Sequence, residues 1–403
     1  MSARIEAGVA FIAPLAAAKV PAKLLAGPAH AHRHANLSSE RRVSPRMGLL
    51  FRGTAAAVAF FVATGPAAAH AVASAGQWSV VHDDRRDSYD AVTVTPGGAV
   101  WVAGTRHPDA GSTGAESLLL KGGRSSFKRV TGPGFRVKRL TSASDTRVWA
   151  FGASRYARWD GKRWQVKRWR YGRVDRAYAI GKNLWVIENS NAFPAAGDAG
   201  WKARSTLRRL AGSVWRRVPT PIMVKGLDGK WAAGSVRGTA ALARWTGTAW
   251  RAVALPAIPS AHSGQISELT DVAVDGETGR VMAVGWVAWP CGTVKRSFCG
   301  ETLLLSGYLG SWNFEVRSEP GIQPRAQAEP DGRGGAWVVY NAKGGGSGFL
   351  HIGADSVEPG TFPAPPNQNV SVRDLAIQPE TGSVWAVGAA PSGRSGLIWT
   401  YGR

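Results

Sequence analysis

Apolar and polar residues alternate along short segments of this chain, and beyond about residue 74 no segment has the longer period of an amphipathic helix. In Trp164-Gln165-Val166-Lys167 the period is two, which predicts a strand with one face against a neighbouring sheet. Glycine stands just before such segments, at Gly161, Gly212 and Gly247. Because glycine adopts the positive φ that a tight turn needs, each predicts a hairpin leading into an aromatic-led strand.

A short apolar phrase recurs seven times, centred on Trp101, Trp149, Trp185, Trp231, Met282, Trp337 and Trp385. Successive centres lie 48, 36, 46, 51, 55 and 48 residues apart, which is typical of the blades of a β-propeller. We therefore predict an all-β fold with seven blades, in which the repeated tryptophans pack between blades. Four tryptophans fall outside the phrases and are expected on loops: Trp169, Trp201, Trp286 and Trp289.

The seventh repeat lacks its last strand. The chain stops at Arg403, at the turn where that strand should begin, while residues 77–81 near the other end form an aromatic-led strand without a partner. We predict that this N-terminal strand completes the last blade and closes the ring, because closure protects sheet edges from pairing with other chains. The propeller is then expected to span residues 74–403.

Residues 47–73 have the order of a signal peptide, with Arg52, an apolar run over 54–64, and small residues up to a cleavage point after Ala71 or Ala73. Residues 1–46 are rich in alanine and arginine and are expected to be a disordered leader or an extension of the gene model. We therefore predict a secreted, extracellular protein. No other stretch approaches the roughly 20 apolar residues of a membrane span, so we expect none in the mature chain.

Both cysteines lie in one insertion of the fifth repeat. In an exported protein, Cys291 and Cys299 are predicted to form a disulfide that pins a loop between strands. A metal site would need further ligands nearby, and the histidines of the mature chain lie far apart in the sequence. The sequence predicts no metal site and no cofactor.

Positive charge is concentrated in one part of the chain. Between Lys121 and Arg217, 24 lysines and arginines stand against five acidic residues, a net charge of about +19, and the rest of the mature chain is nearly neutral. This segment forms the second and third predicted blades, and its densest stretch supplies five candidate anion-binding residues, Arg163, Lys167, Arg168, Arg170 and Arg173. Such a patch attracts polyanions, although solubility alone is an alternative explanation. For an exported protein we expect an anionic cell-wall polymer or acidic polysaccharide as partner, rather than nucleic acid.

The favoured function is a monomeric, non-catalytic binding or scaffold protein. The alternative is a propeller enzyme acting on glycans, a hydrolase or lyase with its site at the mouth of the ring. No catalytic residue is assigned, but five acids are candidates: Asp90, Asp271, Asp275, Glu301 and Asp374. Three of these occupy similar points near blade starts, which indicates a structural role. An enzyme should gather at least two carboxylates within hydrogen-bond reach.

The phrases Val-Trp-Ala-Val-Gly at Val384–Gly388 and Arg-Trp-Asp-Gly-x-x-Trp at Arg158–Trp164 resemble the repeats of secreted propeller proteins from actinobacteria, grouped with Kelch-like and galactose-oxidase central-domain propellers. The resemblance covers residues 76–403 and implies the propeller fold. That group includes enzymes and carbohydrate binders, so the resemblance implies no single function. Galactose oxidases use a copper site with a cysteine cross-linked to a tyrosine, whereas here both cysteines share one loop, so oxidase activity is not expected.

Overall fold

The structure of this protein is a computed structural model of the whole chain. It describes residues 77–107, 114–189, 205–258, 262–291, 298–308, 310–317, 323–341, 346–353, 356–360, 362–363, 369–378, 381–390 and 395–402. All of these residues lie in the second of two units of the chain, His70–Arg403. The predicted leader and signal peptide, the insertion at 191–203 and Trp201 lie outside the described residues.

The described part of the second unit folds into seven antiparallel sheets of four strands each, which confirms the seven-bladed β-propeller. Blade 1 contains β2 (Asp87–Val94), β3 (Val100–Arg106), β4 (Glu116–Gly122) and β5 (Phe127–Arg129). Blade 2 contains β6 (Arg139–Ser144), β7 (Arg147–Phe151), β8 (Arg155–Trp159) and β9 (Trp164–Arg168). Blade 3 contains β10 (Val174–Ile180), β11 (Asn183–Glu188), β12 (Thr206–Ala211) and β13 (Val214–Val218). Blade 4 contains β14 (Met223–Asp228), β15 (Trp231–Val236), β16 (Thr239–Trp245) and β17 (Trp250–Ala252).

The remaining blades follow the same order. Blade 5 contains β18 (Ile266–Val274), β19 (Val281–Pro290), β20 (Phe298–Tyr308) and β21 (Ser311–Arg317). Blade 6 contains β22 (Gln323–Pro330), β23 (Ala336–Asn341), β24 (Ser347–Ile352) and β25 (Val357–Gly360). Blade 7 contains β26 (Ser371–Gln378), β27 (Ser383–Ala389), β28 (Gly396–Tyr401) and, from the other end of the propeller, β1 (Trp78–Asp84).

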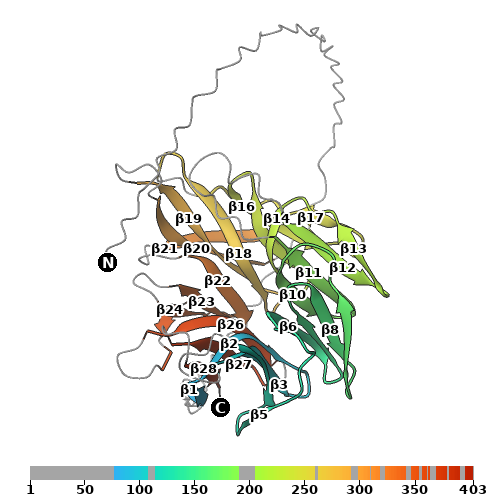
Figure 1. Cartoon of the computed structure of the whole chain (residues 1–403). Coiled ribbons are helices and arrows are strands. Elements are labelled where there is room, and N and C mark those ends of the chain that lie inside the picture. Colours follow the sequence, from blue (N-terminus) through green and yellow to red (C-terminus); the bar gives the residue numbers. More distant parts are fainter. Residues whose placement is uncertain are drawn as a thin grey trace, which may run out of the picture. The chain divides into compact units, whose positions relative to one another are not determined.

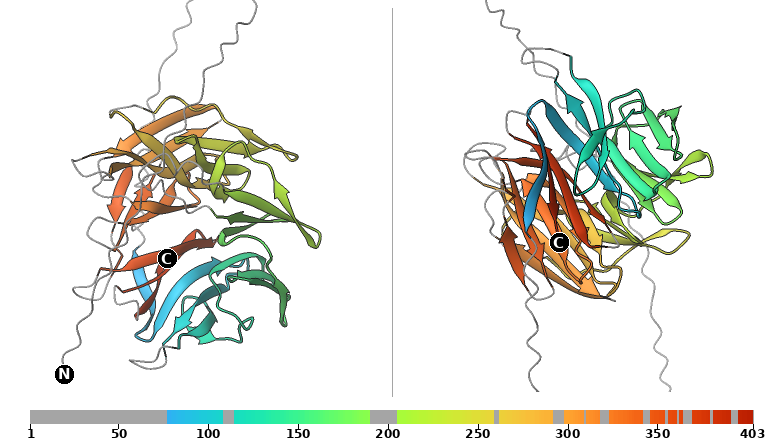
Figure 2. Two further views of the ribbon diagram at one scale, coloured as in Figure 1. Left: turned by 45° about the horizontal axis from the view of Figure 1, so that its top comes forward. Right: turned by 90° about the horizontal axis from the view of Figure 1, so that it is seen from below.

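The N-terminal strand closes the ring as predicted. Strand β1 pairs antiparallel with β28, and Trp78 stands opposite Tyr401 (Figure 1). The first strand of each blade, β2, β6, β10, β14, β18, β22 or β26, contacts the first strand of the next blade, and β26 contacts β2. Figure 2 shows the red strands of blade 7 beside the blue strands from the start of the propeller. Strand β1 therefore covers the edge that β28 would otherwise leave open.

The glycine that ends several repeat phrases has a role that the sequence analysis did not identify. Gly104, Gly234, Gly285 and Gly388 lie within strands, each opposite a β-bulge in the first strand of its blade. A Cβ at Gly104 would lie 2.1 Å from the carbonyl oxygen of Ser88, and the other three positions are equally close to backbone oxygen. Glycine is required here because the bulge brings one backbone onto another. The turn glycines Gly161, Gly212 and Gly247 have φ of 98°, 63° and 103°, as a hairpin demands.

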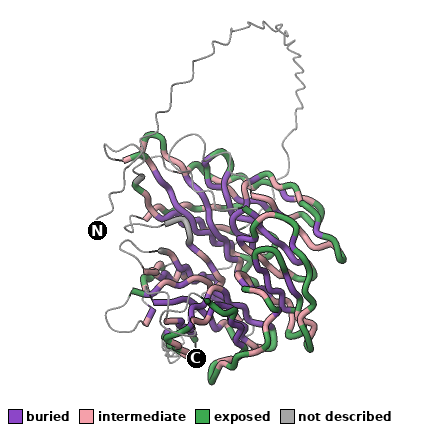
Figure 3. Tube along the Cα trace, in the orientation of Figure 1, coloured by how far each residue is buried: buried purple, intermediate pink, exposed green. Residues whose placement is uncertain are grey.

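The repeated tryptophans pack into the following blade. Trp101 of blade 1 contacts Trp159 and Trp164 of blade 2, with ring centroids 5.6 and 5.7 Å apart. Trp185 of blade 3 contacts Trp245 of blade 4 at 5.4 Å in the same way. Each blade thus supplies one large apolar side chain to the core of the next, which confirms the predicted packing. Buried residues run along the strands and exposed ones gather at the turns (Figure 3).

Two of the tryptophans that were expected on loops lie in a strand instead, whereas Trp169 lies between β9 and β10, outside any strand. Trp286 and Trp289 belong to β19, because β20 continues to pair with β19 as far as Pro290, beyond the repeat phrase. Trp286 is buried, and Trp289 stacks on His262 with centroids 3.8 Å apart. The insertion in the fifth repeat is therefore a longer hairpin. Cys291 and Cys299 form a disulfide at its end, with Cα atoms 5.6 Å apart.

Candidate functional site

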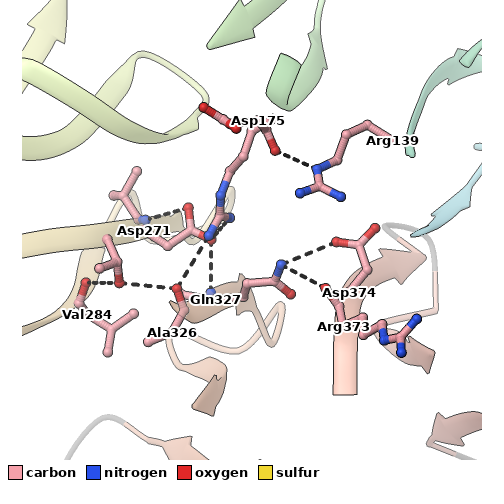
Figure 4. A network of polar contacts seen from close by, with 12 residues as sticks. Arg139, Asp175, Asp271, Val284, Ala326, Gln327, Arg373 and Asp374 are labelled. Atoms are coloured by element: carbon pink, nitrogen blue, oxygen red, sulfur yellow. Dashed lines mark hydrogen bonds and ion pairs between the residues drawn. The ribbon is translucent and has the colours of Figure 1, made fainter. Parts of the chain in front are cut away.

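The first strand of each of the seven blades lies at the inner edge of the ring, and equivalent positions on these strands form two tiers of residues. Each first-tier residue pairs with the residue two positions after the repeated tryptophan or methionine of its blade. The first tier comprises Ala91, Arg139, Arg176, Gly226, Asp271, Gln327 and Asp374. The second tier, two residues further on, comprises Thr93, Thr141, Tyr178, Asp228, Ala273, Glu329 and Ala376. Because side chains two residues apart share one face of a strand, the two tiers lie one above the other. Figure 4 shows the polar contacts made by the first tier.

Asp271 and Asp374 of the first tier and Asp228 of the second tier accept hydrogen bonds from the next blade. Asp374 of blade 7 accepts the N–H of Val92 in blade 1 at 2.9 Å. Asp271 of blade 5 accepts the N–H of Ala328 in blade 6 at 3.2 Å. These N–H groups belong to the free edges of first strands, where a donor without an acceptor is costly. The carboxylates therefore have a structural role, because they satisfy those edges and join neighbouring blades.

Arg176 links three blades through this edge. Its guanidinium donates to the carboxylate of Asp271, two blades away, at 2.5 Å, and also to the carbonyl oxygen of Ala326 in blade 6. The intervening blade contributes Gly226, and a Cβ there would lie 2.2 Å from Oδ1 of Asp271 and 2.7 Å from its Cα. The absence of a side chain on Gly226 is therefore what lets the carboxylate of Asp271 reach Arg176.

Burial shifts the pKa values of the acids at this edge. Burial raises the pKa of Asp228 to about 7. The hydrogen bond that Asp228 accepts from the N–H of Val274 lowers this pKa, and the charge of the nearby Asp271 raises it further. Burial also raises the pKa of Asp374 to about 6, although Arg139 opposes it. The pKa of Glu329 is raised well above its ordinary value, first by burial and then by the carboxylates of Asp228, Asp271 and Asp374. Carboxyl groups whose pKa values are raised toward neutral pH are often found at functional sites.

The five candidate acids of the sequence analysis separate in the structure. Asp271 and Asp374 come together, whereas Asp90 is displaced by one residue because it occupies the bulge itself, and Ala91 takes the first-tier position. Asp90 instead pairs with Lys138 of blade 2 and Arg373 of blade 7. Two acids lie elsewhere, Asp275 in the β18–β19 turn and Glu301 in β20. Asp228 and Glu329 were not among the candidates, because their position opposite Trp231 and Trp337 depends on the register of the strands.

The candidate anion-binding residues lie on the outer strand of blade 2 and in the segment that leads to blade 3. Lys167 and Arg168 end β9, Arg170 and Arg173 follow it, and Arg163 precedes it in the turn from β8. All five side chains are exposed. Arg173 forms an ion pair with Asp175 at 2.8 Å, and Arg163 lies 4.0 Å from Asp160. Lys167, Arg168 and Arg170 make no ion pair within the described part of the chain, so their charge is available to a partner.

Aromatic packing joins the basic residues of blades 2 and 3 into one surface. Trp169 is buried, packs on Trp215 of β13 with centroids 5.1 Å apart, and donates its Nε1–H to the carbonyl oxygen of Gly172. Arg208 of blade 3 lies 3.8 Å over the ring of Tyr171. These contacts hold the segment after β9 against blade 3. Trp169 is buried and cannot stack on a nucleic-acid base, whereas Tyr171 keeps 41% of its surface exposed.

The structure adds two residues to this surface. Arg155 stands directly opposite Arg168 in the β8–β9 hairpin, and Arg216 stands opposite Arg209 in the β12–β13 hairpin. Both Arg155 and Arg216 are exposed. Their place follows from hairpin register, which the sequence analysis did not work out. We call the exposed set Arg155, Arg163, Lys167, Arg168, Arg170, Arg173 and Arg216 the basic rim.

No group of three or more histidine, cysteine, aspartate or glutamate side chains suited to a metal ion occurs among the described residues. In the same part of the chain, no helix has the length and apolar character needed to cross a membrane.

No protein-family model matches this chain, and no curated protein matches its sequence. Solved structures match its fold. The N-terminal domain of Nup159 has 9% sequence identity and a TM-score of 0.51, covering 81% of this chain and 96% of that domain. YCF48, in a structure bound to a D1 peptide, has 12% identity and a TM-score of 0.50, covering 81% of this chain and 97% of its own. The β-propeller domain of the Trilobed protease from Pyrococcus furiosus has 9% identity and a TM-score of 0.47, covering 78% and 93%. At these identities the likeness shows the fold alone: the protein is a seven-bladed β-propeller.

Proposed function

We propose that this protein is an extracellular, non-catalytic binding protein that holds an anionic polymer of the cell wall, or an acidic polysaccharide, on the basic rim of blades 2 and 3. The observation that carries the proposal is the pairing of like charges across these hairpins. Arg155 faces Arg168, and in blade 3 Arg209 faces Arg216. Arg208 faces Arg217, but Arg208 also forms an ion pair with Glu188 at 2.9 Å. Like charges directly opposite each other destabilise a hairpin, and a bound polyanion would remove that cost.

The chemistry of the side chains suits such a polymer. Guanidinium groups donate several hydrogen bonds in a plane that matches phosphate and carboxylate groups. Lys167 and Arg168 are adjacent in β9, so their side chains lie on opposite faces of the sheet, and Arg170 and Arg173 follow beyond the end of the strand. Because β9 is the outer strand of its sheet, a flexible polyanion that follows this edge can meet charges on both faces. Export through the predicted signal peptide would bring the protein to such polymers, and the disulfide Cys291–Cys299 is consistent with an oxidising compartment.

The test uses poly(glycerol phosphate), a flexible polyanion without sugar rings. In the rim variant, Arg163, Lys167, Arg168 and Arg170 are replaced by glutamate. In the control variant the same replacement is made at four exposed basic residues elsewhere, Arg85, Arg86, Lys230 and Arg251. Both variants change the net charge equally, so only the position of the charge differs between them.

We expect the rim variant to bind the polymer at least about tenfold more weakly than wild type, a change of roughly 1.4 kcal/mol, and the control variant to bind within about threefold of it. Wild-type binding should also weaken as salt rises, because the charges are exposed. Both variants should keep the wild-type unfolding temperature. Equal loss in the two variants, or no binding by wild type at low salt, would contradict the proposal.

A second candidate function rests on the inner edge of the ring. Asp228, Asp271, Glu329 and Asp374 interact electrostatically there, and raised pKa values leave protonated carboxyl groups near neutral pH, as a general acid requires. This favours a glycan hydrolase or lyase as the alternative. Under that alternative the wild-type protein would cleave a polysaccharide, Glu329→Gln would abolish cleavage, and the exposed control Glu277→Gln would not. Absence of cleavage across neutral and acidic polysaccharides would remove the alternative.

A further inference from the structure

A groove of about 520 Å³ lies between blades 5 and 6, far along the chain from the basic rim. Three segments line it: the β18–β19 turn with Thr278 and Arg280, the β20–β21 hairpin with Tyr308 and Trp312, and the β22–β23 turn with Arg333. Its volume falls within the range of small-ligand sites. It adjoins a second groove of about 370 Å³, with which it shares Arg280 among other residues. The pair therefore offers room for several units of a chain.

Asp275 holds the walls of this groove together. Its side chain is fully buried and accepts the N–H and the hydroxyl of Thr278 in blade 5, at 2.6 and 2.7 Å. Its other oxygen accepts the N–H of Gly334 in blade 6 at 2.9 Å. Arg280 donates in turn to the carbonyl oxygen of Gly334. The two turns are thus fixed across the blade boundary before any ligand arrives, and a preorganised site loses less entropy on binding.

Aromatic rings form one wall. Tyr308 keeps 51% of its surface exposed, an unusual state for a large ring. Trp312 lies across β20 because Gly307 has no side chain, since a Cβ there would lie 2.2 Å from the indole ring. The far side of Trp312 packs on Trp231 at 5.4 Å, which fixes its orientation. The groove therefore presents a ring surface to a flat, partly apolar ligand.

The charge of the groove is positive. Arg280 and Arg333 line it, and none of its lining residues is acidic. The remaining polar residues, including Ser306, Ser311 and Asn313, are neutral donors and acceptors. A sugar ring offers a C–H face to an aromatic ring and hydroxyls to such side chains, and a carboxylate on that ring would meet the guanidinium groups.

From this charge complementarity we propose that the groove between blades 5 and 6 binds an acidic oligosaccharide. A uronate carboxylate lies between Arg280 and Arg333, and the face of its ring, or of the adjacent ring, lies on Tyr308. This site does not depend on the basic rim, and its ligand is recognised by its ring as well as by its charge.

The test measures binding of tetragalacturonic acid by calorimetry, in the full chain carrying the four glutamates of the rim variant, so that the basic rim no longer has a positive net charge. We expect Tyr308→Ala and Arg333→Ala each to weaken binding about tenfold. Tyr308→Phe, which keeps the ring, should bind within about twofold of its parent, and so should Arg251→Ala, which removes an exposed arginine of blade 4. Tyr308 and Arg333 are exposed, so these variants should unfold at the temperature of the parent.

A tetraglutamate peptide with an acetylated N-terminus and an amidated C-terminus carries the same number of carboxylates without sugar rings, and we expect it to bind at least about tenfold more weakly than tetragalacturonic acid. The proposal is overturned if tetragalacturonic acid does not bind, if the groove variants bind as well as the parent, or if the peptide binds as tightly as the sugar. Because poly(glycerol phosphate) has no rings, its binding to the rim stands or falls separately.

Discussion

Replacing Gly226 by alanine tests the arrangement at the inner edge of the ring. The new Cβ would lie 2.7 Å from Cα of Asp271 and 2.2 Å from its Oδ1. A side-chain end can move away, but the backbone atom cannot move without shifting β18. We therefore expect the carboxylate of Asp271 to be forced off Arg176, whose guanidinium is 22% exposed and pairs with a carboxylate that is 5% exposed.

The size of the effect follows from the pair that is broken. Removing one partner of a buried ion pair costs about 3 to 5 kcal/mol. The unit His70–Arg403 has roughly 330 residues, and at about 2.1 cal/mol/K per residue its unfolding entropy is about 0.7 kcal/mol/K. The unfolding temperature of Gly226→Ala should then fall by about 4 to 7 °C.

The assay is thermal unfolding followed by circular dichroism, with Gly276→Ala as the matched control. Gly276 lies in the β18–β19 turn, and a Cβ there meets nothing within 4 Å. We expect the control to change the stability by less than about 0.5 kcal/mol. Equal unfolding temperatures for Gly226→Ala and Gly276→Ala would refute the argument that glycine is needed to admit Asp271.

Three further predictions concern stability. Because burial raises the pKa of Asp228 to about 7, the folded state holds a proton that the unfolded chain releases near pH 4, so this residue's contribution to stability is lost as pH rises from about 4 to 7. Asp228→Asn keeps an acceptor for the N–H of Val274, so in parallel thermal melts it should be more stable than wild type at pH 8, by on the order of 2 kcal/mol. At pH 4 it should be no more stable than wild type. The same difference in stability at both pH values would contradict this prediction. Deleting residues 74–84 removes β1 and leaves β28 as an open edge, so size-exclusion chromatography should show aggregates, and a monomer of wild-type stability would argue against closure. Replacing both Cys291 and Cys299 by serine should cost no more than about 3 kcal/mol in urea unfolding, because the closed loop is short, and a larger loss would show that the disulfide supports more than its own hairpin.

The fold was predictable because its signals are local. A period of two, a turn glycine such as Gly161 and a recurring tryptophan each act within a few residues, and seven copies at regular intervals leave few alternatives. Closure by β1 also followed from strand counting. The ends of β19 were not predictable, because strand length beyond the repeat phrase depends on pairing with β20.

The inner edge of the ring was only partly predictable. In the sequence, Asp90 resembles Asp271 and Asp374, but each of the three strands has a bulge, and Asp90 occupies the bulged position, one residue before the tier position that Asp271 and Asp374 hold. Register shifts of this kind depend on backbone packing and leave no composition signal. Asp228 and Glu329 were missed because the residues that surround them come from other blades. Only a three-dimensional arrangement relates them.

The basic rim was identified from charge density, yet the sequence did not distinguish paired from unpaired residues. Arg173 is engaged by Asp175, whereas Lys167 and Arg168 make no ion pair within the described residues. Arg216 enters the surface because Trp169 and Trp215 bring β13 against the end of β9. Contact between blades, which no single repeat encodes, decides which charges act together.

The measurement that tests the central claim most directly is an arginine footprint. The full chain is treated with phenylglyoxal in the presence and absence of poly(glycerol phosphate) at low salt, and the modified arginines are located by mass spectrometry. If the polymer binds at the basic rim, Arg155, Arg168, Arg170 and Arg216 should be protected, while the exposed Arg85 and Arg251 should react at unchanged rates. Protection of Arg85 and Arg251 to the same degree, or no protection at the four rim arginines, would contradict the account.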